Sequence, residues 1–581
     1  MQEREPQSSR IASGDRQSRP GGSRPISRKA ALLGGAAFAA SAAGFSCGIV
    51  RSWVRDFDLI IEGGEICDGS GRRLFDADVG IRDGRILAVG KLKQQSSSRR
   101  ISARGLVVAP GFIDLHTHSD TNLLVDGRAW SKVFQGVTTE IVGQDGRSVA
   151  PLTSGMRRGR GVAWQDFAGY HRSLVRRGTS VHVLSMVGAG TLREYVMGRQ
   201  DTYAEPFQIR RMQLLFQRAL EQGARHLSSG LEYQPGSFAS DAELVGILEA
   251  VPKAARRHLV YATHMRNEDD RIESALQEAI TIARWAGVRL HISHFKMQGR
   301  RNWDRLPGLL DMVKRARRSG VPITFDRYPY VAYSTGLQSL FPAWSRDGSH
   351  GRFLGVLRNG DLLPRLRRDV EHKIASLGSY DSVQIARLYV TGRKYEGRRL
   401  GELAAAHGQE PFEFLRQLML REKGGGSMVG FGMNEDNTDR ILRDRFCAIA
   451  SDGSARAVNG VLGRGMPHPR NFGTFPRVLG HYVRERRAIS LREAVRKMTS
   501  LPASILGLKE RGQVRPGYHA DLVLFDPDTV ADRATFLEPK QYSRGIRYVI
   551  VGGTVVVDGG DHTDARPGRV LGPDAFANPI L

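Results

Sequence analysis

The length and the charge of the chain set the first limits on its fold and function. Its 581 residues exceed one ordinary hydrophobic core, so we expect one large domain and a smaller one. The 86 Lys+Arg and 60 Asp+Glu give a net charge of +26, but the arginines are spread over the whole sequence. We therefore expect no nucleic-acid partner, because such a partner needs a concentrated basic surface. The three cysteines exclude a disulfide framework for so large a core.

Residues 1–50 predict a disordered leader followed by an export signal. Residues 1–25 contain too few apolar side chains to bury the surface that folding needs. Ser27-Arg28-Lys29 and the small, apolar stretch 30–44 form the basic and hydrophobic parts of a signal too short to span a bilayer. The pattern resembles a twin-arginine signal with one arginine replaced, so we expect export to the periplasm. The alternative is a cytoplasmic protein with an extension of no consequence, and lipidation of Cys47 stays open.

Short alternating strands separated by glycine turns lie near both ends of the chain. The segments 57–90, 517–527 and 547–560 share this character. We predict one small β-sandwich domain built from residues 56–108 and 512–562. A second domain, residues 109–511, is then inserted between its two halves.

Strands and amphipathic helices alternate through the middle of the chain, which is typical of a parallel sheet with helical crossovers. The expected strands cover residues 108–116, 137–143, 181–188, 226–233, 259–265, 288–295, 323–330 and 446–452. These eight units predict an α/β fold of the TIM-type (β/α)8 barrel class, in which the active site collects at the carboxyl ends of the strands. Residues 345–426 break the rhythm, and we expect an inserted lid or subdomain there, before the last strand.

The first barrel strand ends in two histidines. In VAPGFIDLHTHSD (108–120), His116 and His118 are separated by one residue, and alternate side chains of a strand point to the same face. Neutral imidazole is a common ligand of zinc and similar divalent ions, so the pair supplies two corners of a coordination shell. Two polar residues at a turn are the alternative interpretation.

Polar side chains recur at other strand ends, so further ligands are expected. Asp145 follows strand two, and His264, His294 and Asp452 end strands five, six and eight. Their joint placement at the barrel mouth predicts a metal site. His291 precedes His294 by three residues, so we expect it on the opposite face, packed against a helix, with Lys296 on the side of His294.

An ordered series of motifs runs through the chain. They read APGFIDLHTHSD, QGVTTEIVGQDGRSVAP, SSGLEYQPG, YATHMRNE, HISHFK, DRYPYVAYSTGL, ASDGS and PHPRNFGTFPRVLG. The series resembles the amidohydrolase superfamily and, within it, the N-acyl-D-amino-acid deacylases (D-aminoacylases), over residues 57–560. The resemblance implies a barrel hydrolase that uses one or two divalent ions, zinc first, to cleave N-acyl-D-amino acids into a carboxylate and a free D-amino acid.

The resemblance also implies the roles of single residues. By it the metal ligands are His116, His118, His264, His294 and Asp452, with Asp452 also the general acid and base. Lys296, Tyr328, Ser334 and Arg470 match residues that hold the carboxylate or the reacting carbonyl of the substrate. A planar guanidinium can grip a carboxylate through two hydrogen bonds, which suits Arg470, and a surface arginine is the alternative. Met433 either lines the pocket or packs in the core.

One position departs from the family pattern. Where D-aminoacylases commonly show Gly-Asn-Cys-Gly with the cysteine as a metal ligand, this chain has Gly143-Gln144-Asp145-Gly146. A carboxylate also binds zinc and can bridge two ions, and oxygen in place of sulfur makes manganese or iron more suitable. Glu232, at the end of strand four, is the alternative bridging carboxylate.

Three functions compete. Metal-assisted hydrolysis of a linear amide is favoured, with Asp452 moving a proton from water to the leaving amine. A cyclic amidase of the hydantoinase or dihydroorotase type shares the barrel, but usually carries a lysine at the end of strand four, where this chain has Leu231-Glu232-Tyr233. A non-catalytic exported binding protein has no need of a water-activating ligand set. The expected partner is a small N-acyl amino acid; its acyl group and side chain, and the oligomeric state of the protein, stay open.

Overall fold

The structure is a computed structural model that describes residues 56–346, 350–578 and 580. The predicted leader, the signal-like segment and Cys47 lie outside the described residues, so these predictions stay predictions. Among the helices of the described ranges, none has the length and apolar character that a membrane crossing needs. The described cysteines, Cys67 and Cys447, are buried and free. Burial raises the pKa of both thiols to about 12, so neither is a reactive thiolate.

Parallel strands build a closed barrel. The strands are β6 (Phe112–Asp114), β7 (Val137–Val142), β8 (His182–Ser185), β9 (Val187–Gly188), β10 (Leu227–Gly230), β11 (Val260–His264), β12 (Arg289–Ile292), β13 (Ile323–Arg327) and β17 (Cys447–Ile449). They form a three-stranded sheet β6-β7-β8 and a six-stranded sheet from β9 to β17. Only Met186 separates β8 from β9, and a parallel bridge from Thr117 to Gly453 joins the other two edges. The predicted barrel of the TIM type is therefore confirmed.

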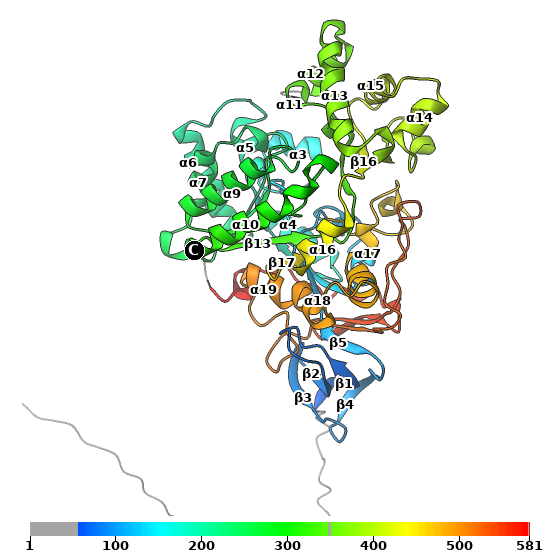
Figure 1. The fold of residues 1–581 in the computed structure, drawn as a ribbon. Helices are drawn as coiled ribbons and strands as arrows, with labels where there is room; N and C mark the ends of the chain where they lie inside the picture. Colours follow the sequence, from blue (N-terminus) through cyan, green and yellow to red (C-terminus); the bar gives the residue numbers. More distant parts are fainter. Residues whose placement is uncertain (1–55, 347–349, 579, 581) are drawn as a thin grey trace, which may run out of the picture. The chain divides into compact units, whose positions relative to one another are not determined.

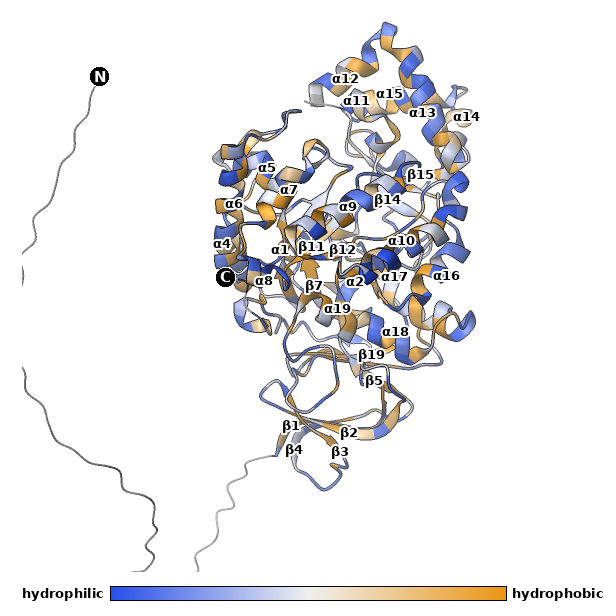
Figure 2. Ribbon diagram, turned by 60° about the vertical axis from the view of Figure 1, so that its left-hand side comes forward, coloured by the Kyte–Doolittle hydropathy of each residue, from blue (hydrophilic) through white to orange (hydrophobic). Residues whose placement is uncertain are grey.

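Amphipathic helices cover the barrel because each has one apolar face. The helices that connect or follow the barrel strands are α1 (Asn122–Val125), α2 (Trp130–Val133), α3 (Ser154–Arg160), α4 (Phe167–Arg177), α5 (Ala189–Met197), α6 (Pro206–Glu221), α7 (Asp241–Leu248), α8 (Lys253–Arg256), α9 (Ile272–Ala286), α10 (Leu306–Arg318), α16 (Glu435–Arg443), α17 (Arg470–Arg477), α18 (Leu491–Met498) and α19 (Ser500–Leu506). On α9, Leu276, Ile280 and Ala283 recur at helical spacing and are buried. Figure 2 shows both orange, hydrophobic residues and blue, hydrophilic ones on the helices around the barrel.

Successive residues of a barrel strand pack into two different cores. Tyr261 of β11 belongs to the core that also contains the helix residues Leu276 and Ile280. Its neighbours Val260 and Ala262 belong to another core, with residues of other barrel strands. Side chains therefore alternate between the helix layer and the barrel interior, as the pleat of a strand requires.

The two ends of the chain meet in one further sheet. It contains β1 (Phe57–Ile66), β2 (Phe75–Arg82), β3 (Arg85–Gly90), β4 (Ser97–Ser102), β5 (Val107–Pro110), β18 (Leu522–Phe525), β19 (Ile546–Val551), β20 (Thr554–Asp558) and β21 (Asp561–His562). The antiparallel pairing of β5 with β18 joins the N-terminal strands to the C-terminal ones. One core holds residues of both groups, including Ile61, Val79 and Leu522. The division of this sheet into the two layers of a sandwich stays a prediction.

Residues between β13 and β17 form a group with its own core. Its strands β14 (Tyr333–Gly336), β15 (Val383–Arg387) and β16 (Ser427–Gly430) make an antiparallel sheet in the order β14-β16-β15. Its helices α11 (Ala343–Arg346), α12 (His350–Arg358), α13 (Leu363–Leu377), α14 (Leu400–Ala406) and α15 (Pro411–Arg421) gather together in Figure 1. This is where the sequence predicted an insertion, although its limits as a domain stay a prediction. Met433 packs in the core of this group.

Candidate metal centre and substrate pocket

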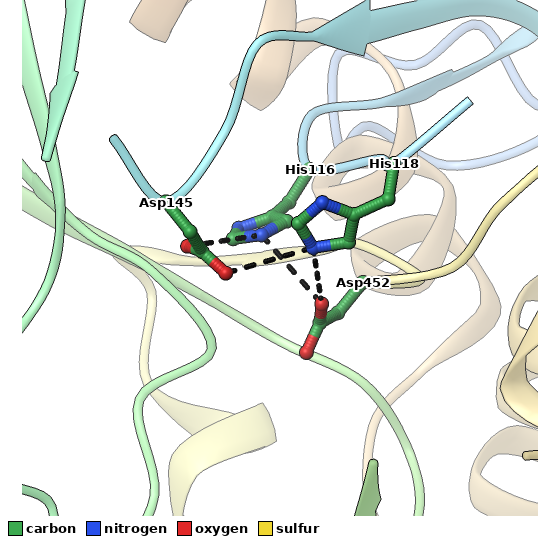
Figure 3. A group of neighbouring side chains, drawn as sticks. All are labelled: His116, His118, Asp145 and Asp452. Carbon is green, nitrogen blue, oxygen red and sulfur yellow. Dashed lines mark hydrogen bonds and ion pairs between the residues drawn. The ribbon is translucent and has the colours of Figure 1, made fainter. Parts of the chain in front are cut away.

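Two histidines and two aspartates converge just beyond the first, second and last barrel strands. His118 Nε2 lies 3.0 Å from Asp452 Oδ1 and 3.5 Å from Asp145 Oδ2. His116 Nε2 lies 3.6 Å from Asp452 Oδ1 and 3.4 Å from Asp145 Oδ1. Figure 3 shows both imidazole rings turned toward the two carboxylates. The ligand atoms of these four residues all lie within 4.8 Å of one another, so one metal ion could contact them together.

A second group shares one of these carboxylates. His264, at the end of β11, places Nδ1 3.8 Å from Asp145 Oδ2. His294 places Nε2 3.5 Å from Asp145 Oδ1 and 2.9 Å from His264 Nδ1. Asp145 thus lies within reach of all four histidines that the sequence predicted as ligands. The arrangement provides two neighbouring ligand groups with one carboxylate in common.

The donor atoms of this cluster fit a cation. Within the described part of the chain, both ring nitrogens of His116 and Oδ1 of Asp145 are buried and make no hydrogen bond. Buried polar atoms normally have hydrogen-bond partners. A cluster of unpaired nitrogen and oxygen atoms therefore suits a bound cation, which accepts their lone pairs. Zinc binds imidazole nitrogens together with carboxylate oxygens. The carboxylate oxygens of this set are also suitable ligands for manganese or iron.

The turn that carries Asp145 depends on two glycines. Gly143 and Gly146 have φ angles of 80° and 71°, in the left-handed region. A Cβ on Gly146 would lie 2.6 Å from the amide nitrogen of Gly230, so glycine is also needed for close approach to β10. Asp145 itself has a φ of 53°, which aspartate tolerates better than most residues. The local sequence therefore fixes the direction of the carboxylate.

Glu232 approaches the site from another side. Its Oε2 lies 3.0 Å from Nε2 of His264, whereas Asp145 and His294 face Nδ1 of the same ring. A carboxylate on the far nitrogen orients a metal-binding histidine and does not bridge two ions. The geometry supports Asp145 over Glu232 as the shared carboxylate.

Asp452 is held on both sides. Its Oδ2 forms an ion pair of 2.7 Å with Arg470, while Oδ1 faces His118. Burial raises the pKa of Asp452, but Arg470 and His294 outweigh this effect and hold the pKa far below its usual range. The carboxylate is therefore ionised at neutral pH.

The cluster opens into a pocket that also contains the residues predicted to hold the substrate. The cavity measures about 340 Å³, and its lining includes Lys296, Tyr328, Ser334 and Arg470. The Arg470 guanidinium carbon lies 4.8 Å from the centre of the Tyr328 ring. The Tyr328 hydroxyl is buried and, within the described residues, makes no hydrogen bond. Ser334 belongs to β14, so the insertion supplies part of the wall.

Sequence analysis missed Glu268, which holds two predicted residues in place. Its Oε1 accepts a hydrogen bond of 2.7 Å from Lys296 and lies 3.0 Å from Nδ1 of His294. The sequence contains one indication of this role, because Glu268 lies four residues after His264 within the motif YATHMRNE. Lys296 is consequently paired with a buried carboxylate and also lines the pocket.

Asp326 is a second residue that sequence analysis missed. It lies on β13, its Oδ1 accepts a hydrogen bond of 2.9 Å from the His294 amide, and its Oδ2 lies 3.6 Å from His116 Nδ1. A carboxylate on the second ring nitrogen fixes the orientation of a metal-binding histidine. In the sequence it is a single acidic residue within the expected strand 323–330.

The prediction for His291 is wrong. Its neighbours Leu290 and Ile292 pack in the core shared with the helices, so His291 faces the barrel interior. There its Nε2 lies 2.9 Å from Asp326 Oδ2. The argument from alternation fails because β12 ends at Ile292 and His294 has a φ of 37°. The chain has left the strand before it reaches His294.

Comparison with known proteins points to one family. The amidohydrolase family matches residues 99–417 and 453–557 of this chain. The N-acyl-D-glutamate deacylase of Alcaligenes xylosoxydans xylosoxydans is 35% identical over 528 residues, which cover 89% of this chain and 97% of that relative.

Solved structures agree with this likeness. The crystal structure of the N-acyl-D-glutamate deacylase from Bordetella bronchiseptica, complexed with zinc and a phosphonate mimic of the tetrahedral intermediate, is 35% identical with a TM-score of 0.75. The match covers 89% of this chain and 99% of that one. A D-aminoacylase with a binuclear metal centre is 36% identical with a TM-score of 0.74, over 89% of this chain and 100% of that one.

Proposed function

We propose, since this chain belongs to the amidohydrolase family, that it is a metal-dependent hydrolase that cleaves N-acyl-D-amino acids to a carboxylate and a free D-amino acid. The observation that carries the proposal is the convergence of four histidines on Asp145 beside the ionised Asp452. The D configuration follows from the relatives, which act on N-acyl-D-amino acids.

The metal ligands in this proposal belong to the two groups that share Asp145. They are His116, His118, Asp145, His264, His294 and Asp452, and they would hold one or two ions, zinc first. A bound divalent ion lowers the pKa of a water toward neutrality and polarises the scissile carbonyl. The contacts of Asp326 and Glu268 keep two of the imidazoles turned toward the site.

Asp452 performs the proton transfer. Arg470 engages Oδ2, so Oδ1 remains on the side of His118, where it can accept the proton of the attacking water. The same carboxyl then returns the proton to the nitrogen of the leaving amine, which prevents departure of an amide anion. Oδ1, the oxygen that does not pair with Arg470, is therefore the atom that would carry the proton in both steps.

The substrate's carboxylate is assigned to the polar wall of the pocket. Arg470, Tyr328, Ser334 and Lys296 all line it. The Tyr328 hydroxyl, which has no hydrogen-bond partner among the described residues, is a free donor, and the Arg470 guanidinium and Lys296 ammonium supply positive charge. These groups can hold the carboxylate or the reacting carbonyl of an N-acyl amino acid.

The alternatives have less support. A cyclic amidase of the hydantoinase type would place a lysine after β10, where this chain has Glu232 against His264. A pure binding protein has no use for an ionised base within 3.0 Å of a histidine in a metal-ligand cluster.

A substrate screen tests the function. Purified protein with added zinc, manganese or cobalt should hydrolyse N-acetyl-D-amino acids faster than their L isomers, and a chelator should abolish the activity. The matching N-acetyl-D-amino-acid carboxamides should react poorly, because they lack the charge that Arg470 recognises. Metal-loaded protein that hydrolyses a hydantoin but no linear substrate would favour the cyclic-amidase reading.

We also propose export to the periplasm, supported by Arg28-Lys29 and the apolar stretch 30–44. Residues 1–55 fused to a reporter that functions only outside the cytoplasm should give a signal. Replacing Arg28 and Lys29 with glutamine should remove it, because the basic region is what an export receptor recognises. A silent wild-type fusion in a host with working export would favour a cytoplasmic protein.

A further inference from the structure

Lys132, on α2, is fully buried beneath the metal site. Its side chain is 0% exposed, and its ammonium lies 2.7 Å from Asp114 and 3.2 Å from Glu140, which are also 0% exposed. A buried charge is costly unless it is paired and hydrogen-bonded. One ammonium between two carboxylates satisfies this condition, yet pairing alone does not explain where its remaining hydrogen bonds go.

The remaining hydrogen bonds go to the segment that carries the proposed base. Lys132 Nζ donates to Ser451 Oγ at 2.9 Å and to the Gly453 carbonyl at 3.3 Å. These residues flank Asp452, whose φ of 50° lies in the left-handed region, which aspartate adopts more readily than most residues other than glycine. The lysine therefore contacts the chain on both sides of the proposed base.

The two carboxylates extend this network to the histidine segment. Asp114 lies two residues before His116 and accepts hydrogen bonds from the amide and the hydroxyl of Ser451, at 2.8 and 2.5 Å. Glu140 accepts a hydrogen bond of 2.6 Å from Ser119, just after the second histidine. The ammonium thus lies where the ends of the first and last barrel strands are fastened together.

Backbone hydrogen bonds complete the junction. The Asp452 amide donates to the His116 carbonyl, and the His118 amide donates to the Gly453 carbonyl, each at 2.9 Å. The Gly453 carbonyl is also an acceptor for Lys132. A shift of either segment would move Asp452 relative to both histidines.

We propose that Lys132 is a positioning residue for the hydrolysis: it fixes Asp452 against His116 and His118 by joining the two chain segments that carry them. The kinetic part of this inference rests on the proposed function, and the spectroscopic part does not.

Two variants and one control separate positioning from simple charge balance. Lys132→Met removes the ammonium, and Lys132→Met with Glu140→Gln also restores the original net charge of the buried group. The double variant still lacks the donors to Ser451 and Gly453. The control is Lys497→Met, because Lys497 is also 0% exposed and donates to the backbone carbonyls of Asp444 and Cys447, at the opposite end of β17.

The double variant is expected to lose at least about tenfold in kcat with KM within about twofold, since small displacements of a reacting group lower turnover strongly. The d–d absorption of cobalt(II) bound in place of the natural metal should change, because the ligands shift. Lys497→Met should retain kcat and the cobalt spectrum below its melting temperature. The double variant decides the case even where Lys132→Met alone does not fold.

Wild-type kcat and cobalt spectrum in the double variant would overturn the proposal and leave Lys132 as a charge-balancing residue. Equal losses in Lys497→Met would overturn it as well, because they would reflect general destabilisation. A wild-type protein inactive toward every N-acyl amino acid would count against the proposed function alone, since the cobalt spectrum needs no substrate.

Discussion

Asp452→Asn is expected to lower turnover by at least about a hundredfold, the lower bound for loss of a general acid and base. Asparagine keeps the size of the side chain but cannot accept the proton of water. The fold should survive, because the Asp452 amide still donates to the His116 carbonyl and the bridge from Thr117 to Gly453 is backbone only. Turnover and metal content are measured together on the purified variant.

The variant will also leave Arg470 without its charged partner, so some loss of stability is expected. Breaking one side of a buried ion pair typically costs about 3–5 kcal/mol. The assay temperature must therefore lie below the melting temperature of the variant. Asp444→Asn is a suitable control, because Asp444 caps Phe446 at the opposite end of β17 and asparagine can keep that hydrogen bond. Near-wild-type turnover in metal-loaded Asp452→Asn would refute the proton-transfer role.

The barrel could be predicted because its strands repeat one simple pattern. Each is a short apolar run followed by a polar residue, and helices of period 3.6 separate the runs. Since carboxyl ends of parallel strands meet at one mouth, the convergence of His116, His264 and Asp452 followed from their order along the chain. These residues lie at or just beyond the ends of β6, β11 and β17.

The alternation rule failed where the chain leaves a strand. It requires extended backbone, and His294 lies beyond β12 with a φ of 37°. Histidine adopts a positive φ more often than most residues, but the hydrogen bond from the His294 amide to Asp326 is a tertiary contact that the local sequence does not reveal. His291 therefore faces the barrel interior, although the alternation rule had placed it against a helix.

Supporting residues escaped prediction for a similar reason. Lys132 reaches residues 451 and 453 across more than three hundred positions of sequence, and nothing local distinguishes it from a surface lysine. Its role becomes visible only when the first and last strands are adjacent. Metal ligands can be predicted from their position at strand ends. The residues that orient these ligands can be recognised only in the closed barrel, where the first and last strands are adjacent.

Asp145→Ala is expected to lose bound metal and activity together. The Asp145 carboxylate lies between 3.4 and 3.8 Å from a ring nitrogen of each of four histidines, so its removal withdraws an oxygen donor from both ligand groups at once. The proposed ligand set would then keep one carboxylate, that of Asp452, to offset the charge of a divalent cation. Metal content by elemental analysis and turnover on the same sample measure this.

Asp145→Cys tests the chemistry of the position. A thiolate also carries negative charge and prefers zinc, so this variant should bind metal with its preference shifted toward zinc over manganese. The turn should accept it less readily, since cysteine is less tolerant than aspartate of the φ of 53° found there. Competition between zinc and manganese in wild type and variant gives the shift directly.

Glu232→Gln is the matched control for the Asp145 variants. Glu232 faces Nε2 of His264, away from the shared site, so its loss should weaken metal binding by about 10- to 100-fold at most and leave the number of ions unchanged. If Asp145 is the shared ligand, Asp145→Ala must lose more metal than Glu232→Gln. Asp145 contacts both ligand groups, whereas Glu232 contacts only the His264 ring among these ligands. Full metal occupancy in Asp145→Ala, with loss only in Glu232→Gln, would transfer the ligand role to the end of β10 and reduce Asp145 to a residue that shapes its glycine-flanked turn.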